Sequence, residues 1–218
     1  MWEVRQPAGE GEERMKSFIV FAVTFLILFG AGSFPTSMGQ QKPADMNHEE
    51  ALKEARRLAD ELIDKIRGLL FQEIQKGGPV GAVSVCSEVA QDITREFNRH
   101  TGHYARRVSV RVRNPQNFPD EYELLLLARM ELENRQKHLT KEYVEVVNEQ
   151  TEKVLRYMRP LIAAPVCLNC HGPKEAIKPE VKRVLSDRYP EDQATDFHDG
   201  DLRGAISVKI LLKPKQTR

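Results

Sequence analysis

The sequence predicts an α+β fold, in which helices pack beside an antiparallel sheet. In the N-terminal half, apolar residues recur at steps of three and four, which indicates amphipathic helices. Later runs alternate apolar and polar residues and are rich in valine and isoleucine, which indicates half-buried strands. Helices and strands do not follow one another in regular βαβ order, so a parallel α/β sheet is disfavoured.

Length and charge narrow the class of protein. The 218 residues are enough for one domain with a proper core, or for two small ones. The net charge is +1, with basic and acidic residues mixed along the chain. Since no basic block stands out, we expect no nucleic-acid partner.

Residues 1–39 are predicted to lie outside the fold. The stretch "MKSFIVFAVTFLILFGAGS" starts at Met15, has a short apolar core and ends in small residues, as a secretory signal peptide does. We expect translation to start at Met15 and cleavage to fall between Ser33 and Gly39. The protein would then be periplasmic or otherwise extracytoplasmic. The alternative is an uncleaved N-terminal membrane anchor.

Residues 40–79 are predicted to form a linker and an amphipathic helix. The apolar positions of the helix are Leu52, Ala55, Ala59, Leu62, Ile66 and Leu69. Gly77, Gly78 and Pro79 should end it. A plain packing helix is the favoured interpretation. Because the spacing is nearly that of a heptad repeat, the alternative is a homodimer contact or a signalling helix.

Residues 80–218 are predicted to form the main domain. It should begin with a helix that ends at Phe97 and carries Cys86 on its apolar face. Alternation in "RRVSVRVR" predicts a strand over 107–113. We then expect a helix over 121–136 and two strands, 141–147 and 152–163, around a turn at Asn148 and Glu149. A short helix over 174–187 and a last strand over 203–213 complete the domain.

The motif "CLNCH" carries the most specific chemistry. Cys167 and Cys170 are three apart, and His171 follows directly. A redox disulfide would need only the two thiols, and a closed zinc site would need a second pair of ligands, for which no second C-x-x-C exists. Covalent attachment of one haem c explains all three residues, with thioethers at the cysteines and the histidine as the proximal iron ligand. It also agrees with export.

The ligand on the other face of the iron decides what such a protein does. The candidates are Cys86, Met130, Met158, His100, His103, His138 and His198. Cys86 is favoured because it lies on an inward helix face. Free cysteine is often only a small buried apolar residue, so a histidine or methionine ligand and an open face stay as alternatives.

Four stretches carry a family resemblance: "AVSVCSEVA", "VSVRVRNPQNFPDEYE", "APVCLNCHG" and "GDLRGAISV", all between Val80 and Leu212. Together they resemble a bacterial family of single-haem c-type proteins with a PAS-like fold. The resemblance implies an antiparallel PAS-like sheet and axial ligation by His171 and Cys86. Asp196 stands where this resemblance leads us to expect glycine.

The resemblance implies a sensor of redox state or of a diatomic gas (O2, NO or CO) that signals to a redox or signalling partner. The first alternative is a periplasmic electron-transfer cytochrome. A peroxidase-like haem enzyme is less favoured, and we expect no enzyme activity. Arg107, Arg111 and Arg113 are candidate contacts for the haem propionates, because a guanidinium binds carboxylates well, or they form a solvated edge.

Overall fold

A computed structural model of the chain describes residues 46–212, apart from the side chains of residues 86–88. All described residues belong to one compact unit. The predicted signal peptide lies outside the described residues. Within the described part of the chain, no helix has the length and apolar content needed to cross a membrane.

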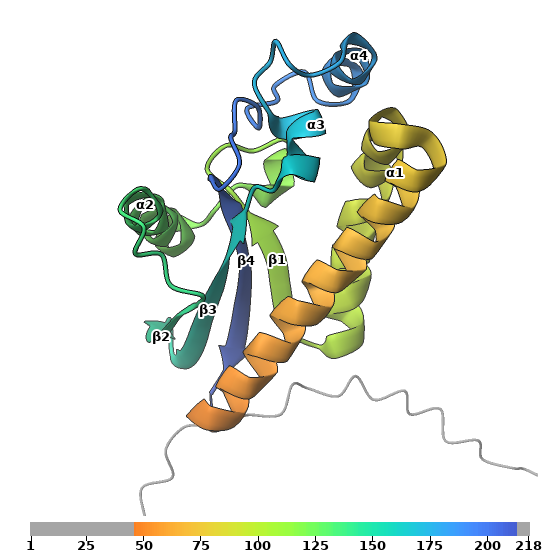
Figure 1. The fold of residues 1–218 in the computed structure, drawn as a ribbon. Helices are drawn as coiled ribbons and strands as arrows, with labels where there is room; N and C mark the ends of the chain where they lie inside the picture. Colours follow the sequence, from red (N-terminus) through yellow and green to blue (C-terminus); the bar gives the residue numbers. More distant parts are fainter. Residues whose placement is uncertain (1–45, 213–218) are drawn as a thin grey trace, which may run out of the picture. The chain divides into compact units, whose positions relative to one another are not determined.

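The N-terminal helices form a hairpin of two arms. Helix α1 runs over His48–Thr101 and is broken at Gly78, whose φ of 63° and ψ of −167° are not helical. Glycine tolerates this conformation, and the following Pro79 cannot continue the first arm's hydrogen bonds. The break confirms the predicted helix end. Figure 1 shows the two arms folding back on each other.

Four antiparallel strands form one sheet in the order β1-β4-β3-β2. Their bounds are Tyr104–Val108 for β1, Tyr143–Glu149 for β2, Glu152–Ile162 for β3 and Leu202–Leu211 for β4. The last strand therefore pairs with both the first and the third. This places β4 inside the sheet, where apolar side chains are buried on both of its faces.

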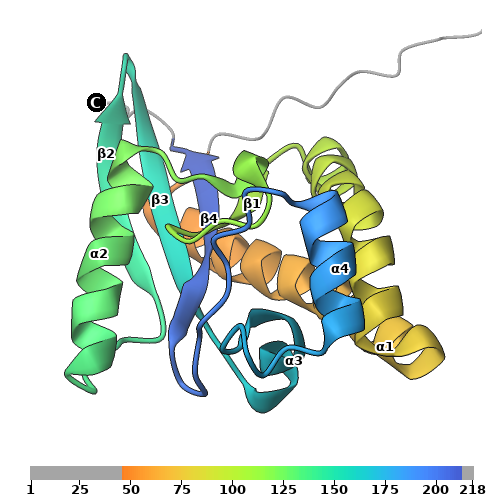
Figure 2. The same ribbon diagram turned by 90° about the horizontal axis from the view of Figure 1, so that it is seen from above.

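Helices cover both faces of the sheet. The first arm of α1 buries small and branched residues such as Ala55, Leu58 and Leu62 against β1, β3 and β4. Helix α2, Glu121–Arg135, buries Leu126, Leu127 and Met130 on the opposite face. Figure 2 shows α1 and α2 on opposite sides of the strands.

Two short helices lie near one end of the sheet. They are α3, Leu168–His171, and α4, Pro179–Arg188. Helix α4 packs Val181 and Leu185 against Val83 of the second arm of α1. Two 3-10 turns connect these elements. One is η1, Pro115–Asn117, which follows β1, and the other is η2, Pro165–Cys167, which directly precedes α3.

Several predicted boundaries were wrong. The helix predicted over 174–187 is the shorter α4, and the helix predicted to end at Phe97 runs on to Thr101. The predicted strand 107–113 is replaced by β1, which starts at Tyr104 and ends at Val108. It ends there because the Ser109 amide donates to Asn117 of η1 instead of to a strand. The turn between β2 and β3 lies at Gln150 and Thr151, where Gln150 has a φ of 55°. The α+β class is confirmed, and the narrower PAS-like comparison stays a prediction.

Candidate functional site

A cavity of about 280 Å³ lies between the α1 hairpin and the sheet. Its walls are mainly apolar. The apolar lining comes from both arms of α1, from β1, β3 and β4, and from the segments that follow β1 and β3: Ile63, Ile66, Leu70, Ile74, Ala82, Val83, Ala90, Val108, Val112, Leu161, Ile162, Val166 and Ile206. The cavity therefore has the composition of a pocket for a large apolar ligand with a few polar anchors.

The C-x-x-C-H residues lie together on one wall of this cavity. Cys167 ends η2, and Cys170 and His171 lie on the single turn of α3 that follows. All three line the cavity, and both cysteines are half-buried. The end of η2 and the turn of α3 thus present two thiols and an imidazole to the same space.

Gly172 allows the chain to leave this turn. A Cβ atom at Gly172 would lie 2.6 Å from the Leu168 carbonyl oxygen and 3.2 Å from the Leu168 Cβ. The Gly172 amide donates to that carbonyl oxygen at 3.0 Å, which closes the turn. We infer that glycine is required because the backbone comes this close to itself.

The ring of His171 is held in one orientation. Its Nδ1 lies 2.6 Å from the Ala194 carbonyl oxygen, so Nδ1–H donates and Nε2 keeps its lone pair. Phe197 packs edge-on against the ring, with centroids 6.3 Å apart. Burial, together with the charges of Arg203 and Arg113, holds the pKa of His171 well below its usual range. The imidazole is therefore neutral, as a metal ligand must be.

The loop that carries Ala194 also contains the unexpected aspartate. Asp196 has a φ of 59°, the left-handed region that favours glycine, and aspartate tolerates it better than most residues do. Its Oδ1 accepts a hydrogen bond from the Lys174 amide at 2.9 Å. The Asp196 and Phe197 amides donate to the carbonyl oxygens of Gly172 and His171. The loop therefore packs directly against the C-x-x-C-H turn.

The candidate arginines take three different positions. Arg113 lines the cavity, and its guanidinium is bonded to Asp192 and to the carbonyl oxygens of Cys170 and Ala194. Arg111 stacks on the Phe197 ring, 3.8 Å from its centroid, and is not among the described residues that line the cavity. Arg107 lines the cavity from β1.

The sequence analysis missed two arginines that line the cavity, the exposed Arg67 of α1 and Arg203. Arg203 lies on β4. Its Nη1 donates to the Ser109 hydroxyl at 2.9 Å and to the Arg111 carbonyl at 3.3 Å. Burial, followed by repulsion from Arg113 and Arg107, lowers the pKa of Arg203 to about 9. Arg203 lies in the stretch "GDLRGAISV", which carries part of the family resemblance, but its surroundings come from distant segments, so the sequence did not show its role.

The side chain of Cys86 lies outside the described part of the structure. Its backbone belongs to the second arm of α1. Ala82 and Val83, one turn before it, and Ala90, one turn after it, all line the cavity.

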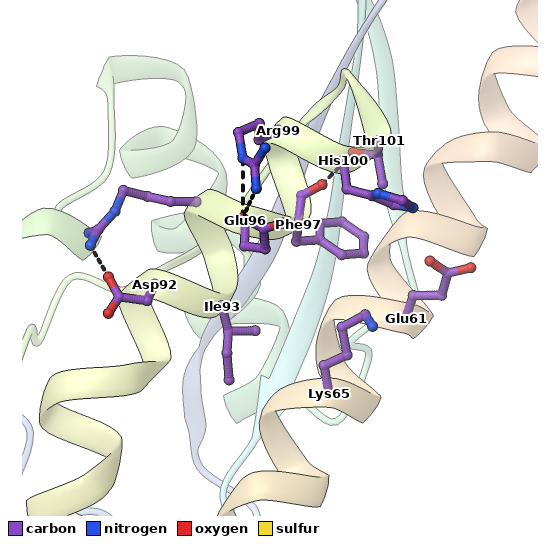
Figure 3. Close-up of a pocket in the computed structure, with 10 residues that line it drawn as sticks. Glu61, Lys65, Asp92, Ile93, Glu96, Phe97, Arg99, His100 and Thr101 are labelled. Atoms are coloured by element: carbon purple, nitrogen blue, oxygen red, sulfur yellow. Dashed lines mark hydrogen bonds and ion pairs between the residues drawn. The ribbon is translucent and has the colours of Figure 1, made fainter. Parts of the chain in front are cut away.

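The other candidate ligands lie elsewhere. Met130 and Met158 are fully buried in the core beneath α2. His100 lines a separate groove between the two arms of α1, beside Glu96 and opposite Glu61 and Lys65 (Figure 3). His103, His138 and His198 are not among the described lining residues of the cavity. In the described residues, no cluster of three or more His, Cys, Asp or Glu side chains has the arrangement of a metal site.

Comparison with known proteins identifies relatives of this chain. It is similar to a solved structure described as the crystal structure of the cyanobacterial heme-protein Tll0287, with 25% sequence identity and a TM-score of 0.58. The similarity covers 78% of this chain and 99% of that one. No curated protein matches the chain. The family model described as Tll0287-like matches residues 43–210, which is most of the chain. The chain therefore belongs to the Tll0287-like family.

Proposed function

We propose that this chain is a c-type haem protein with one covalently bound haem. Cys167 and Cys170 would form the thioethers, and His171 would be the proximal iron ligand through Nε2. One observation carries the proposal: the two thiols and a neutral, pre-oriented imidazole, from the end of η2 and from α3, line the same apolar cavity. The solved relative is described as a heme-protein, which supports the same ligand class.

The residues present fit a haem on three counts. The cavity walls are apolar on both the helix and the sheet side, as a porphyrin requires. The His171 Nδ1–H donates to a backbone carbonyl, which sets the tautomer of an iron ligand. Arginines line the cavity and can pair with carboxylates. Bound haem would supply one-electron iron chemistry, while the chain excludes water and fixes the axial ligands.

Cys86 is proposed as the distal ligand, opposite His171. Ala82, Val83 and Ala90 line the cavity, and residues three or four positions apart share a helix face. This placement of described neighbours supports a cysteine ligand from the second arm of α1. A thiolate ligand would favour ferric iron.

We favour a sensor of redox state or of O2, NO or CO over a plain electron carrier. The second arm of α1 lines the cavity and joins the first arm through the non-helical Gly78. Gly78 can therefore act as a hinge, about which a change of iron ligand on the second arm would reorient the two arms. The outer face of the hairpin would present that change to a partner or to a second copy of the chain. Export, as the predicted signal peptide suggests, would place this outside the cytoplasm.

The test is covalent haem in full-length protein made by a host that matures c-type haem. We expect one haem per chain, retained on a denaturing gel and detected by haem staining. The double variant Cys167→Ser/Cys170→Ser should lose the stain. Protein that accumulates without any haem would overturn the proposal.

The matched control is Cys86→Ser. It should keep the covalent haem, because the thioether cysteines are intact, but lose a thiolate-type low-spin EPR signal. An unchanged EPR spectrum would reject Cys86 as ligand. A wild-type signal typical of histidine–methionine ligation, with the same ligands in both oxidation states, would favour the electron-transfer alternative. A high-spin signal would favour an open face, as the peroxidase-like alternative requires.

A further inference from the structure

Positive charge at the cavity exceeds what its described lining residues can balance. Four basic side chains line it, Arg67, Arg107, Arg113 and Arg203, and no described lining residue is acidic. Asp192, which is not among the described lining residues, forms an ion pair with Arg113 at 3.0 Å. Burying a guanidinium without an anion is costly, so the half-buried Arg203, which has no ion pair with a described carboxylate, indicates an anionic ligand.

Arg203 has the donors for that ligand. Its two described hydrogen bonds both use Nη1, and they hold the guanidinium against Ser109 and Arg111. The Nε atom is buried and has no partner among the described atoms. Nε and Nη2 form the edge of a guanidinium that binds a carboxylate through two parallel hydrogen bonds. That edge is unused by the described protein atoms.

Arg113 cannot serve in the same way. All of its described hydrogen bonds go to the protein, to Asp192 and to the carbonyl oxygens of Cys170 and Ala194. Since the Ala194 carbonyl also accepts from His171, Arg113 braces the C-x-x-C-H turn and the loop that orients its imidazole. Arg111 lies closer to the face of Phe197 than Arg203 does, at 3.8 Å against 5.2 Å from the ring centroid, and it is not among the described residues that line the cavity.

We propose that Arg203 is the residue that binds a carboxylate of the haem, with Arg107 beside it, and that Arg113 positions the attachment turn. This inference rests on the proposed function. It replaces the sequence-based expectation for Arg111 and Arg113 with a residue from β4. Arg107 faces the same side of the sheet as Ile206, its partner on β4, and both of these residues line the cavity together with Arg203.

The first experiment compares holoprotein variants by resonance Raman spectroscopy of the propionate bending modes. Arg203→Met should shift these modes, because the carboxylate loses a bidentate partner, and Arg203→Lys should shift them less. Arg95→Met is the control: it removes an exposed arginine of α1 that pairs only with Asp92 among the described residues. Its spectrum should match wild type. Modes unchanged in both Arg203 variants would overturn the inference.

The second experiment isolates the carboxylate. In the full-length Cys167→Ala/Cys170→Ala background, haemin binds without thioethers and its affinity is measurable. Arg203→Met should raise the Kd for haemin by roughly tenfold and leave the Kd for haemin dimethyl ester unchanged. Equal weakening for both ligands would mean that Arg203 only supports the fold and would overturn the inference.

A free anion is the other source of the same chemistry. Titrating wild-type holoprotein with phosphate distinguishes a haem propionate from a solution anion. If a solution anion binds Arg203, the spectrum should change on addition of phosphate, and the propionate modes should be the same in wild type and in Arg203→Met. That result would overturn the inference. Absence of haem from wild-type protein is a different failure, because it would reject the proposed function before Arg203 is considered.

Discussion

Two buried arginine clusters on this sheet have opposite surroundings. On the α2 side, Arg156 is 2% exposed and is bonded to Glu149 at 2.5 Å and to Asp120 at 2.8 Å, with Glu123 at 3.7 Å. Burial alone would lower the pKa of Arg156, but the carboxylates of Glu149 and Asp120 outweigh burial and raise it. On the cavity side, burial and neighbouring arginines lower the pKa of Arg203 to about 9.

The difference separates structural charge from charge kept for a ligand. The Arg156 cluster supplies its own anions, so it is complete without a ligand. The carboxylate of Asp192 acts on the Arg203 guanidinium, but among the described residues its ion pair is with Arg113. A guanidinium without a paired anion lowers the stability of the ligand-free chain, and the chain regains that stability when an anion binds.

The largest expected effect is at Arg156. Arg156→Met should lower the free energy of unfolding by roughly 3–5 kcal/mol, because it leaves the fully buried Glu123 with Arg106 alone. Urea unfolding of the haem-free chain measures this. The double variant Arg156→Met/Glu123→Gln should recover part of the loss. A loss below about 1 kcal/mol would mean that the α2-side cluster is not structural and would remove the contrast.

The next effect is at Gly172, where backbone packing, not ion pairing, places the site. Gly172→Ala should cost roughly 1–3 kcal/mol, since the new Cβ would meet the Leu168 carbonyl oxygen at 2.6 Å. Haem incorporation per chain should fall with it. The control is Gly68→Ala, on the first arm of α1, where a Cβ would meet nothing within 4 Å. Equal yields of haem in both variants would contradict this account of the turn.

Some parts of this structure could be predicted from the sequence and others could not. The hairpin break was predictable because Gly77, Gly78 and Pro79 act locally, and the C-x-x-C-H residues stay together in any fold because they span five positions. Arg203 is different: its bond to Ser109 joins residues 94 positions apart. The end of β1 depends on Asn117 of η1 in the same way. Contacts of this kind follow from tertiary packing, which a local pattern does not encode.

The α2-side cluster should also show in the pH dependence of stability. Asp120 caps α2: its Oδ1 accepts from the Glu123 amide. Burial alone would raise the pKa of Asp120, but the Glu123 amide and Arg156 outweigh it and hold the pKa below 3.8. The carboxylate therefore contributes stability above its unfolded pKa and loses it as the pH falls through the folded pKa.

Asp120→Asn measures that contribution. At neutral pH it should cost about 1 kcal/mol, because asparagine still caps the helix but no longer pairs with Arg156. The gap between wild type and variant in urea unfolding should narrow as the pH falls from about 5 towards 2. A gap that is constant over this range would show that the charge of Asp120 contributes nothing.

The smallest expected effect on stability is at Arg203, and it is the most direct test of the contrast between the Arg203 and Arg156 clusters. In the haem-free chain, Arg203→Met should change the free energy of unfolding by less than about 1 kcal/mol, because losing two Nη1 hydrogen bonds is offset by relief of repulsion from Arg113 and Arg107. Arg156→Met, at a buried arginine of the same sheet, supplies the comparison. A loss at Arg203 as large as that at Arg156 would mean that both clusters are complete without a ligand. If Arg203→Met leaves the free energy of unfolding almost unchanged but weakens haemin binding, then the charge of Arg203 serves ligand binding and that of Arg156 stabilises the fold.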